Sequence, residues 1–496
     1  MSRVAGVFLT VLAIAAVCVQ PVSAAPRRGL DWRACGDGME CAKLVVPVDW
    51  ADPTGPKTTV DLAKLPARVP ATKVGDLVVN TGGPSTTIQS VRAQPAVLTQ
   101  LTTWFDMILI DPRGFGDKDS ATPNPCGPPA PHIFGLTQAT DERAWNAYAE
   151  RNAAYDRGCR EAGGDTYRGY TSWQIAHDLE SLRVALGDAK LRYFGNSYGT
   201  VYGQAYAELF GSRIDRMYLE GVADHTQPRL IDWLANYART DEQQLDRFAE
   251  WCAQRVNCFL HDDGVGPVYD ELLNRVRRAP LPAPGAGAGS TVDADMLVAT
   301  VREGLNVPYW PKLAQALAEA KNGDAGRLLT DPALHPRDDP PGAPSSPSRA
   351  SLCHDFMPVV PGYAEFRGIE TVLKRLAPRV GWMQGRYELG RCLGIGSGPA
   401  YPPHPLRATG VPPVLVGVGD LDNNTNRLGA DHVAHQFPGG RILRNGDGHA
   451  AYLLLGGRRE DSCLRTTVNR YLVEGTLPER GTHCPAEIVP TIPDRP

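Results

Sequence analysis

The sequence predicts an α/β protein with a mostly parallel central sheet and an inserted, mainly helical cap domain. Short apolar runs end in loop-forming residues, as buried parallel strands do. These runs are LVVN at 77–80, MILID at 107–111, LRYFG at 191–195, MYLEG at 217–221 and VLVGVGD at 414–420. The strand rhythm stops between residues 224 and 405, where helical stretches and Pro/Gly-rich loops replace it.

The elements follow in order along the chain. Residues 171–187 predict a helix before the run at 191–195, because Thr171 and Gln174 suit a capping box and Gly187 suits the C-terminal stop. Its apolar residues repeat at intervals of four, three and four, at Ile175, Leu179, Leu182 and Leu186. The stretches at 241–254 and 310–320 predict cap helices. We expect a signal peptide at 1–25, the first part of the sheet domain at 26–224, the cap at 225–405, and the C-terminal part of the sheet domain at 406–496.

The N-terminus predicts export. Arg3 precedes an apolar run at 4–19, and small residues follow where signal peptidase would cut, after Ala24 or Ala25. A membrane anchor is the alternative, but the run is short for a bilayer span. We therefore expect a secreted protein with no membrane attachment after cleavage. Because the net charge is -4 and no lysine-arginine run is present, we do not expect the protein to bind nucleic acid.

The cysteines predict disulfides. Eleven cysteines less Cys18 leave ten in the mature chain, and an even number in an exported protein favours disulfides over metal or redox chemistry. We expect no metal and no cofactor. His432 and His435 form an HxxH pattern, but it lacks the glutamate of a metalloprotease helix, so we interpret it as a helix face.

A glycine-flanked serine is the candidate nucleophile. Ser197 lies between Gly195 and Gly199, after a predicted strand and before a predicted helix. A serine raised on such a sharp turn requires small residues two positions away on both sides. The alternative, a serine that only caps the helix, predicts no acid or base later in the chain. Both follow, however, as an acidic strand end at Asp420 and Asp422 and as His449.

The order Ser, Asp, His is that of α/β-hydrolases, so we predict a catalytic triad on that fold. Asp420 and Asp422 both lie near the strand end and both could serve as the acid; we prefer Asp422. Asp447 is so close to His449 that we interpret it as a turn residue.

The chain resembles the secreted bacterial tripeptidyl aminopeptidases, relatives of the prolyl aminopeptidases within the α/β-hydrolases. The resemblance covers nearly the whole mature chain. It rests on CAKLVVPVDWADP, FDMILIDPRGFGDKDS, DLESLRVALGDAKLRYFGNSYGT, FAEWCAQRVNC, LCHDF and YLVEGTLPERGTHC.

The resemblance assigns roles to individual residues. It implies that Ser197 is the nucleophile, His449 the general base and Asp422 the residue that orients it. The turn at 82–84 matches the family's Gly-Gly-Pro turn, so the N–H groups of Gly83 and Tyr198 would form the oxyanion hole. With the even cysteine count, it implies five disulfides: Cys35–Cys41, Cys126–Cys159, Cys252–Cys258, Cys353–Cys392 and Cys463–Cys484.

The function implied is a serine exopeptidase that releases short N-terminal peptides, most of all tripeptides, through an acyl-enzyme. Such an enzyme needs a carboxylate in the cap to bind the free ammonium group of the peptide, and Asp355 is the candidate. The sequence departs from the family where Ser85, Thr86 and Thr87 replace further glycines, and where residues 423–426 read NNTN instead of a proline-containing loop.

Two other functions fit the residues. The first is an esterase or amidase that acts on a small secondary metabolite, because a triad does not choose between esters and amides. The second is a non-catalytic binding protein on a hydrolase fold. No feature of the sequence sets the oligomeric state.

Overall fold

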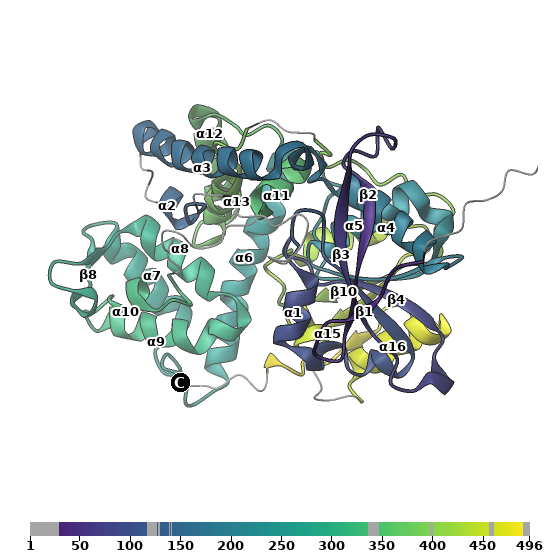
Figure 1. Ribbon diagram of the computed structural model, residues 1–496. Helices are drawn as coiled ribbons and strands as arrows, with labels where there is room; N and C mark the ends of the chain where they lie inside the picture. Colours follow the sequence, from purple (N-terminus) through teal and green to yellow (C-terminus); the bar gives the residue numbers. More distant parts are fainter. Residues whose placement is uncertain are drawn as a thin grey trace, which may run out of the picture.

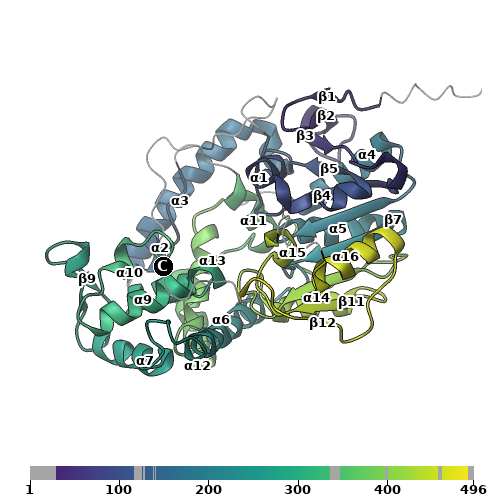
Figure 2. The same cartoon turned by 90° about the horizontal axis from the view of Figure 1, so that it is seen from below.

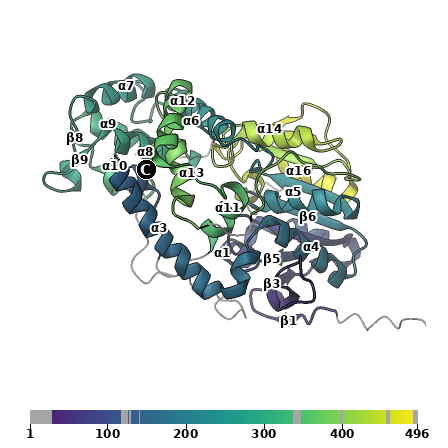
Figure 3. The same ribbon diagram turned by 90° about the horizontal axis from the view of Figure 1, so that it is seen from above.

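The computed structural model describes residues 29–116, 126, 129–137, 139, 141–335, 347–396, 400–455 and 461–489. The signal peptide expected at 1–25 lies outside the described residues. Figure 1 shows two parts, a twisted sheet with its covering helices on the right and a group of helices on the left. Figures 2 and 3 show the same division from below and from above.

Within the described residues, ten strands form one sheet in the order β1-β2-β3-β5-β4-β6-β7-β10-β11-β12. The pairs β1–β2, β2–β3 and β3–β5 are antiparallel, and the remaining neighbours are parallel. The strands are β1 (Arg33–Ala34), β2 (Glu40–Pro47), β3 (Lys57–Leu65), β4 (Gly75–Asn80), β5 (Phe105–Ile110), β6 (Leu191–Asn196), β7 (Ile214–Glu220), β10 (Leu415–Gly419), β11 (Arg441–Asn445) and β12 (His483–Cys484). The five predicted runs are therefore confirmed as β4, β5, β6, β7 and β10, which lie side by side.

Helices cover both faces of the sheet. On one face lie α4 (Ser172–Leu186), α5 (Gly199–Phe210) and α14 (Arg427–Gln436), and on the other lie α1 (Thr87–Ala93), α15 (Ala451–Leu454) and α16 (Cys463–Glu474). Successive strand residues point to opposite faces, so Val78 joins the first core cluster whereas Val79 joins the second. Continuous apolar runs result because both faces are buried.

Helix α4 begins and ends where predicted, but only half of the capping box forms, because the Thr171 N–H donates to the Gly169 carbonyl and the Gln174 side chain binds Trp50 N–H and Asp49. The Thr171 side chain accepts a hydrogen bond from the Gln174 N–H, and Gly187 ends the helix in the left-handed conformation. After α4 the chain continues into β6, and Ser197 directly follows that strand.

The helical part corresponds to the expected cap. It contains α6 (Leu230–Ala253), α7 (Val265–Val276), α8 (Ala294–Gly304), α9 (Trp310–Lys321), α10 (Arg327–Thr330), α11 (Ser348–Phe356), α12 (Tyr363–Leu376) and α13 (Gln384–Cys392). The predicted helical stretch at 241–254 lies in α6 except for its last residue, which caps the helix, and the stretch at 310–320 lies in α9. A small hairpin pairs β8 (Leu281–Pro282) with β9 (Thr291–Val292).

Two further helices belong with the cap although they precede Ser197. These are α2 (Phe134–Thr137) and α3 (Glu142–Gly163), which the sequence boundaries assign to the sheet domain. In Figure 1, α3 runs beside α12 and α13. The Tyr148 hydroxyl donates to the Gly390 carbonyl at 2.7 Å, and the Trp145 ring stacks on Phe366 with centroids 4.7 Å apart. The cap is thus built from two separate chain segments, because the buried face of α3 packs against α12 and α13, which lie more than 200 residues later in the sequence.

All five expected disulfides are present: Cys35–Cys41, Cys126–Cys159, Cys252–Cys258, Cys353–Cys392 and Cys463–Cys484. The bond between Cys353 and Cys392 joins α11 to α13, and the bond between Cys463 and Cys484 joins α16 to β12. In the part of the chain that the structure describes, every helix is too short or too polar to span a bilayer.

Candidate active site

Ser197 lies in a strained turn between β6 and α5. Its backbone has φ +53°, a left-handed conformation that is uncommon for residues other than glycine and recurs at functional sites. A Cβ atom on Gly195 would lie 2.6 Å from the Gly199 carbonyl oxygen, and one on Gly199 would lie 2.7 Å from the Asn80 carbonyl oxygen. Both glycines are therefore required if the turn is to present the serine at the end of the sheet.

His449 and Asp422 form a buried pair. His449 follows β11 and Asp422 follows β10, and His449 Nδ1 lies 3.1 Å from Asp422 Oδ2. The Thr425 hydroxyl donates to the same oxygen at 2.7 Å, and the N–H groups of Asn424 and Thr425 donate to Oδ1. This arrangement fixes the carboxylate against the imidazole.

The electrostatics of the pair favour an ionised acid. Burial acts to raise the pKa of Asp422, but the His449 charge and the hydrogen bonds from His449 and Thr425 hold that pKa below its usual value. For His449, burial acts to lower the pKa, but Asp422 and then Glu220 raise it above its ordinary value. The imidazole is thus placed to accept a proton.

The two other aspartates near the histidine have different partners. Asp420 Oδ2 lies 2.6 Å from Nε2 of His483, the first residue of β12. Asp447 accepts hydrogen bonds from the backbone N–H groups of the C-terminal tail, at Glu487, Ile488 and Val489. The structure therefore brings Asp422, and neither of the other two, to His449.

The turn after β4 faces the serine. Gly82 and Gly83 both have positive φ, and a Cβ atom on Gly82 would lie 2.6 Å from Ser197 Cβ. Among the hydrogen bonds of the described residues, neither the Gly83 N–H nor the Tyr198 N–H donates to a protein acceptor. Ser85 closes the turn, because its N–H and its hydroxyl both donate to the Gly82 carbonyl. Two N–H groups are thus left for a substrate oxygen.

A cavity of about 280 Å³ joins these groups to the cap. Ser197, His449, Gly83 and Tyr198 line it from the sheet domain. The cap contributes Trp233, Tyr237, Arg302, Leu352, Phe356, Tyr387, Glu388 and Arg391. In this conformation, and within the residues described, no hydrogen bond joins the Ser197 hydroxyl to His449; such contacts often tighten only when substrate binds.

Asp355 does not occupy the position expected of an ammonium-binding residue. Its side chain is fully buried and lies outside the cavity lining. It accepts hydrogen bonds from the Ser172 N–H at 3.0 Å, the Ser172 hydroxyl at 2.5 Å and the Tyr198 hydroxyl at 2.7 Å. Burial raises its pKa to about 7. The expectation for Asp355 therefore does not fit this structure, in which the carboxylate joins α11 to α4 and lies outside the cavity lining.

Glu388 of α13 is the cap carboxylate that lines the cavity. Its Oε1 accepts a hydrogen bond from Gln384 Nε2 at 2.7 Å, and Arg391 Nη1 lies 3.8 Å from its Oε2. Sequence reasoning missed this residue. Charged residues three positions apart on a helix, such as Glu388 and Arg391, are typical of a solvated helix face, so only the tertiary structure identifies Glu388.

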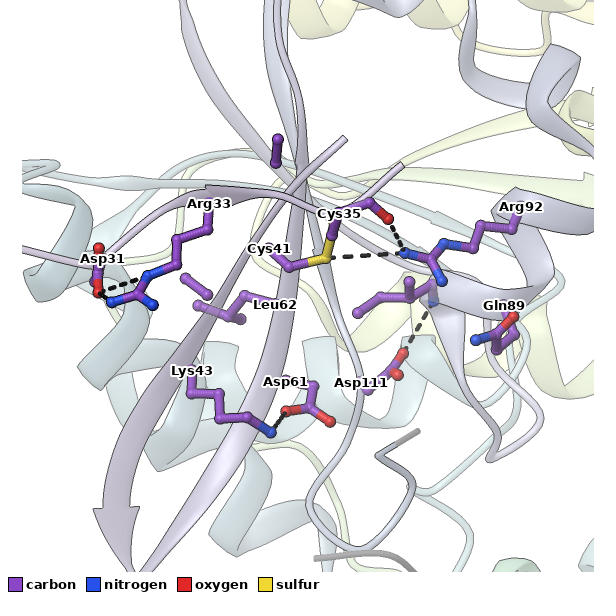
Figure 4. Close-up of a pocket in the computed structure, with 13 residues that line it drawn as sticks. Asp31, Arg33, Cys35, Cys41, Lys43, Asp61, Leu62, Gln89, Arg92 and Asp111 are labelled. Carbon is purple, nitrogen blue, oxygen red and sulfur yellow. Dashed lines mark hydrogen bonds and ion pairs between the residues drawn. A yellow bond between two sulfur atoms is a disulfide. The ribbon is translucent and has the colours of Figure 1, made fainter. Parts of the chain in front are cut away.

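A larger hollow of about 580 Å³ lies away from these residues, beside α1 and the Cys35–Cys41 disulfide (Figure 4). Its charged side chains face one another: Arg33 bonds Asp31 at 2.6 Å, and Lys43 bonds Asp61 at 2.9 Å. None of the triad candidates lines it. We therefore place the candidate active site in the smaller cavity.

The HxxH histidines lie on α14, as the interpretation of a helix face predicts. His432 Nδ1 lies 2.9 Å from Asp224, and His435 Nδ1 lies 2.6 Å from the Asp431 carbonyl oxygen. The described portion of the chain contains no group of three or more His, Cys, Asp or Glu side chains that could hold a metal ion.

Similarities to known proteins extend over most of the chain. Residues 77–285 match a family model described as alpha/beta hydrolase fold, and residues 379–484 match one described as TAP-like protein. Serine protease Hip1 of Mycobacterium tuberculosis is 27% identical over 526 residues, covering 97% of this chain and 98% of the relative. Tripeptidyl aminopeptidase of Streptomyces lividans is 25% identical over 504 residues, covering 94% and 88%. Carboxylesterase B of M. tuberculosis is 28% identical over 476 residues, covering 90% and 86%.

Proposed function

The chain belongs to the tripeptidyl aminopeptidase family of α/β-hydrolases, and from this premise we propose that it is a secreted serine exopeptidase that removes short peptides, most of all tripeptides, from free N-termini. Its relatives and its fold make it a serine hydrolase of the peptidase type. The observation that carries the finer proposal is a cavity that holds Ser197 and His449 at one side and a cap carboxylate, Glu388, at another.

Each step of the reaction has a group at hand. His449 takes the proton of the Ser197 hydroxyl, and Asp422 stabilises the imidazolium that forms. The serine oxygen attacks the carbonyl carbon of the scissile bond. The N–H groups of Gly83 and Tyr198 hold the resulting oxyanion, the leaving amine takes the proton from His449, and water then releases the acyl group.

Glu388 is the proposed partner of the substrate's ammonium group. Arg391 lies too far from Oε2 for a hydrogen bond, so that oxygen keeps acceptor capacity toward the cavity. The aromatic side chains of Trp233, Tyr237 and Tyr387 line the same cavity, as do Arg302 and Arg391. An ammonium group bound in this partly dehydrated site would fix the distance from the N-terminus to Ser197, and that distance would set the length of the released peptide.

Secretion has two independent supports. The N-terminal segment has the composition of a signal peptide, and five disulfides are typical of an oxidising compartment.

The test compares peptides with free and acetylated N-termini. A charge-assisted contact contributes roughly 1.5–3 kcal/mol, so acetylation should lower kcat/KM at least about tenfold. Glu388→Gln should lower kcat/KM for free peptides by a similar factor. It should also reduce the ratio of kcat/KM between free and acetylated peptides. Glu365→Gln, which changes an exposed carboxylate on α12 of the same cap, is the matched control and should change neither value.

Mass spectrometry of the products from a mixed peptide library gives the released lengths. Equal cleavage of acetylated and free peptides would exclude the exopeptidase. Cleavage of small esters or amides without cleavage of peptides would favour the esterase or amidase instead, and the similarity to carboxylesterase B is the observation that supports that alternative.

A further inference from the structure

A further buried acid lies beneath the candidate triad and has no part in the mechanism above. Glu220 is the last residue of β7, and 2% of its surface is exposed. Its carboxylate accepts hydrogen bonds from Tyr452 N–H at 2.8 Å, from the Tyr218 hydroxyl at 3.2 Å and from Asn196 Nδ2 at 3.3 Å. Among the described residues no lysine or arginine forms an ion pair with it. A buried carboxylate without an ion-pair partner is costly even when it is hydrogen-bonded, which suggests a role for Glu220 beyond packing.

The donors to Glu220 come from both catalytic loops. Asn196 directly precedes Ser197, and Tyr452 lies three residues after His449. The Ser197 N–H also donates to the Glu220 carbonyl oxygen at 2.9 Å. The next residue, Gly221, packs against the imidazole, since a Cβ atom there would lie 2.7 Å from His449 Nδ1 and Cε1. Residues 220 and 221 therefore lie between the two loops and contact both.

We propose that Glu220 is a positioning residue of the active site: it holds the loop that carries His449 against the turn that carries Ser197, and its negative charge stabilises the imidazolium that forms during the reaction. The inference rests on the proposed roles of Ser197 and His449. It assigns a second carboxylate to the histidine, on a different strand from Asp422 and without a direct hydrogen bond to the ring.

The charged surroundings of Glu220 determine its pH response. His449 and Asp422 face it from the loops after β11 and β10, and Tyr218 and Tyr452 face it from β7 and α15. Arg465 of α16 lies beyond Tyr452, 4.8 Å from the ring centroid. Burial raises the pKa of Glu220 to about 7, against the hydrogen bonds from Tyr452 and Tyr218 and the charge of His449. Glu220 and His449 therefore titrate as an interacting pair.

The experiment measures the rate at which a fluorophosphonate probe labels Ser197 from about pH 5 to about pH 8. This rate depends on His449 as base but not on which peptide the enzyme accepts. In Glu220→Gln the plateau rate should fall about 10- to 100-fold, by analogy with the loss of the outer partners that orient metal-binding histidines. The acid limb of the pH–rate profile, where protonation of His449 lowers the labelling rate, should also move to lower pH. The reason is that Glu220→Gln removes a carboxylate that raises the pKa of His449.

Two further variants separate charge from packing. Glu220→Asp keeps the charge, so its acid limb should return toward that of the wild type even if the shorter side chain leaves the rate low. Asp447→Asn changes another buried carboxylate in the loop before His449, one that binds only the C-terminal tail, and should leave the acid limb in place.

Each outcome decides the inference. A Glu220→Gln enzyme with the wild-type rate and acid limb overturns it, and so does one with a lower rate but an unmoved acid limb, which would make Glu220 only structural. If Glu220→Gln does not fold, Tyr218→Phe replaces it; loss of that donor should move the acid limb in the same direction by less, and an unmoved limb overturns the inference. Labelling that persists in Ser197→Ala would instead overturn the proposed function.

Discussion

At the residue scale, the candidate site depends on which carboxylate faces the imidazole. Three aspartates lie within a few residues of the strand ends that carry the site, yet each is committed to a different partner. Asp422 is bound to His449 and Thr425, Asp420 to His483, and Asp447 to backbone N–H groups of the tail. Because the acid of a catalytic triad hydrogen-bonds directly to the imidazole, these partners favour Asp422 as the acid.

We predict that Ser197→Ala abolishes turnover, with a loss on the order of a millionfold, while the protein stays folded. Asp422→Asn should lower kcat by about ten thousandfold, because an amide no longer holds the required tautomer of His449. Steady-state kinetics on a tripeptidyl amide with a free N-terminus measure both losses, and circular dichroism checks the fold.

Asp420→Asn is the matched control for the acid. It should keep nearly the wild-type kcat, since Asp420 contacts the partly exposed His483 rather than His449. An inactive Asp420→Asn beside an active Asp422→Asn would reverse the assignment of the acid.

Single residues differ in how far sequence predicts their role. The turn around Ser197 is a local motif: the spacing of Gly195 and Gly199 already contains the steric requirement, and the structure brings Ser197, Asp422 and His449 to one place. Asp355 and Glu388 are different. Whether a cap carboxylate faces a cavity or a neighbouring helix depends on how the cap packs on the sheet domain. The sequence around either residue does not indicate this packing.

At the element scale, the cap is fixed to the sheet domain by buried polar contacts. Asp355 at the end of α11 bonds the first residue of α4 and also Tyr198, the residue after the proposed nucleophile. The same helix is joined to α13, which carries Glu388, through Cys353–Cys392. The helix α11 therefore links the serine turn to the proposed ammonium site.

Sequence periodicity predicts strands and helices better than it predicts their partners. The five apolar runs of the sheet are correct because burial on both faces leaves a strong local signal. Helix α3 has an equally clear amphipathic face, but that face packs on α12 and α13, and so the predicted cap boundary at residue 225 omits it.

We predict that Asp355 makes folding stability fall as the pH rises. Burial raises its folded-state pKa to about 7, above an unfolded value of about 4. Below about pH 4, Asp355 is protonated in both the folded and the unfolded state, and its contribution to the free energy of unfolding is complete. Between about pH 4 and 7 the unfolded state loses the proton first, so this contribution is lost as the pH rises. Asp355→Asn should remove this slope, which is at most about 4 kcal/mol across the window, in urea unfolding at several pH values.

Glu370→Gln provides a control of opposite sign. Burial acts to raise the pKa of Glu370, but Arg386 holds it below the usual value, so its contribution is present at neutral pH and is lost as the pH falls. A pH dependence of Asp355→Asn identical to that of the wild type would contradict the assigned pKa.

At the scale of the whole molecule, the site is assembled where the sheet meets the cap. The turns after β4, β6, β10 and β11 meet at the same edge of the sheet, because parallel strands bring their carboxyl ends together. The cap then covers this edge with side chains from α6, α8, α11 and α13. A substrate must therefore reach Ser197 within a cavity bounded by both parts.

This enclosure predicts how the enzyme acts on a long substrate. A folded domain that carries an unstructured N-terminal tail should lose tripeptides one after another from the free end, because only a chain end can enter the cavity and bring its ammonium group to Glu388. Time-resolved mass spectrometry should show a ladder of products, each shorter by one tripeptide, that stops at the folded domain. The same tail with an acetylated end, or attached at the C-terminus, should remain intact. Early fragments cut within the tail would mean that the cap opens to an extended chain, and the enzyme would then be an endopeptidase.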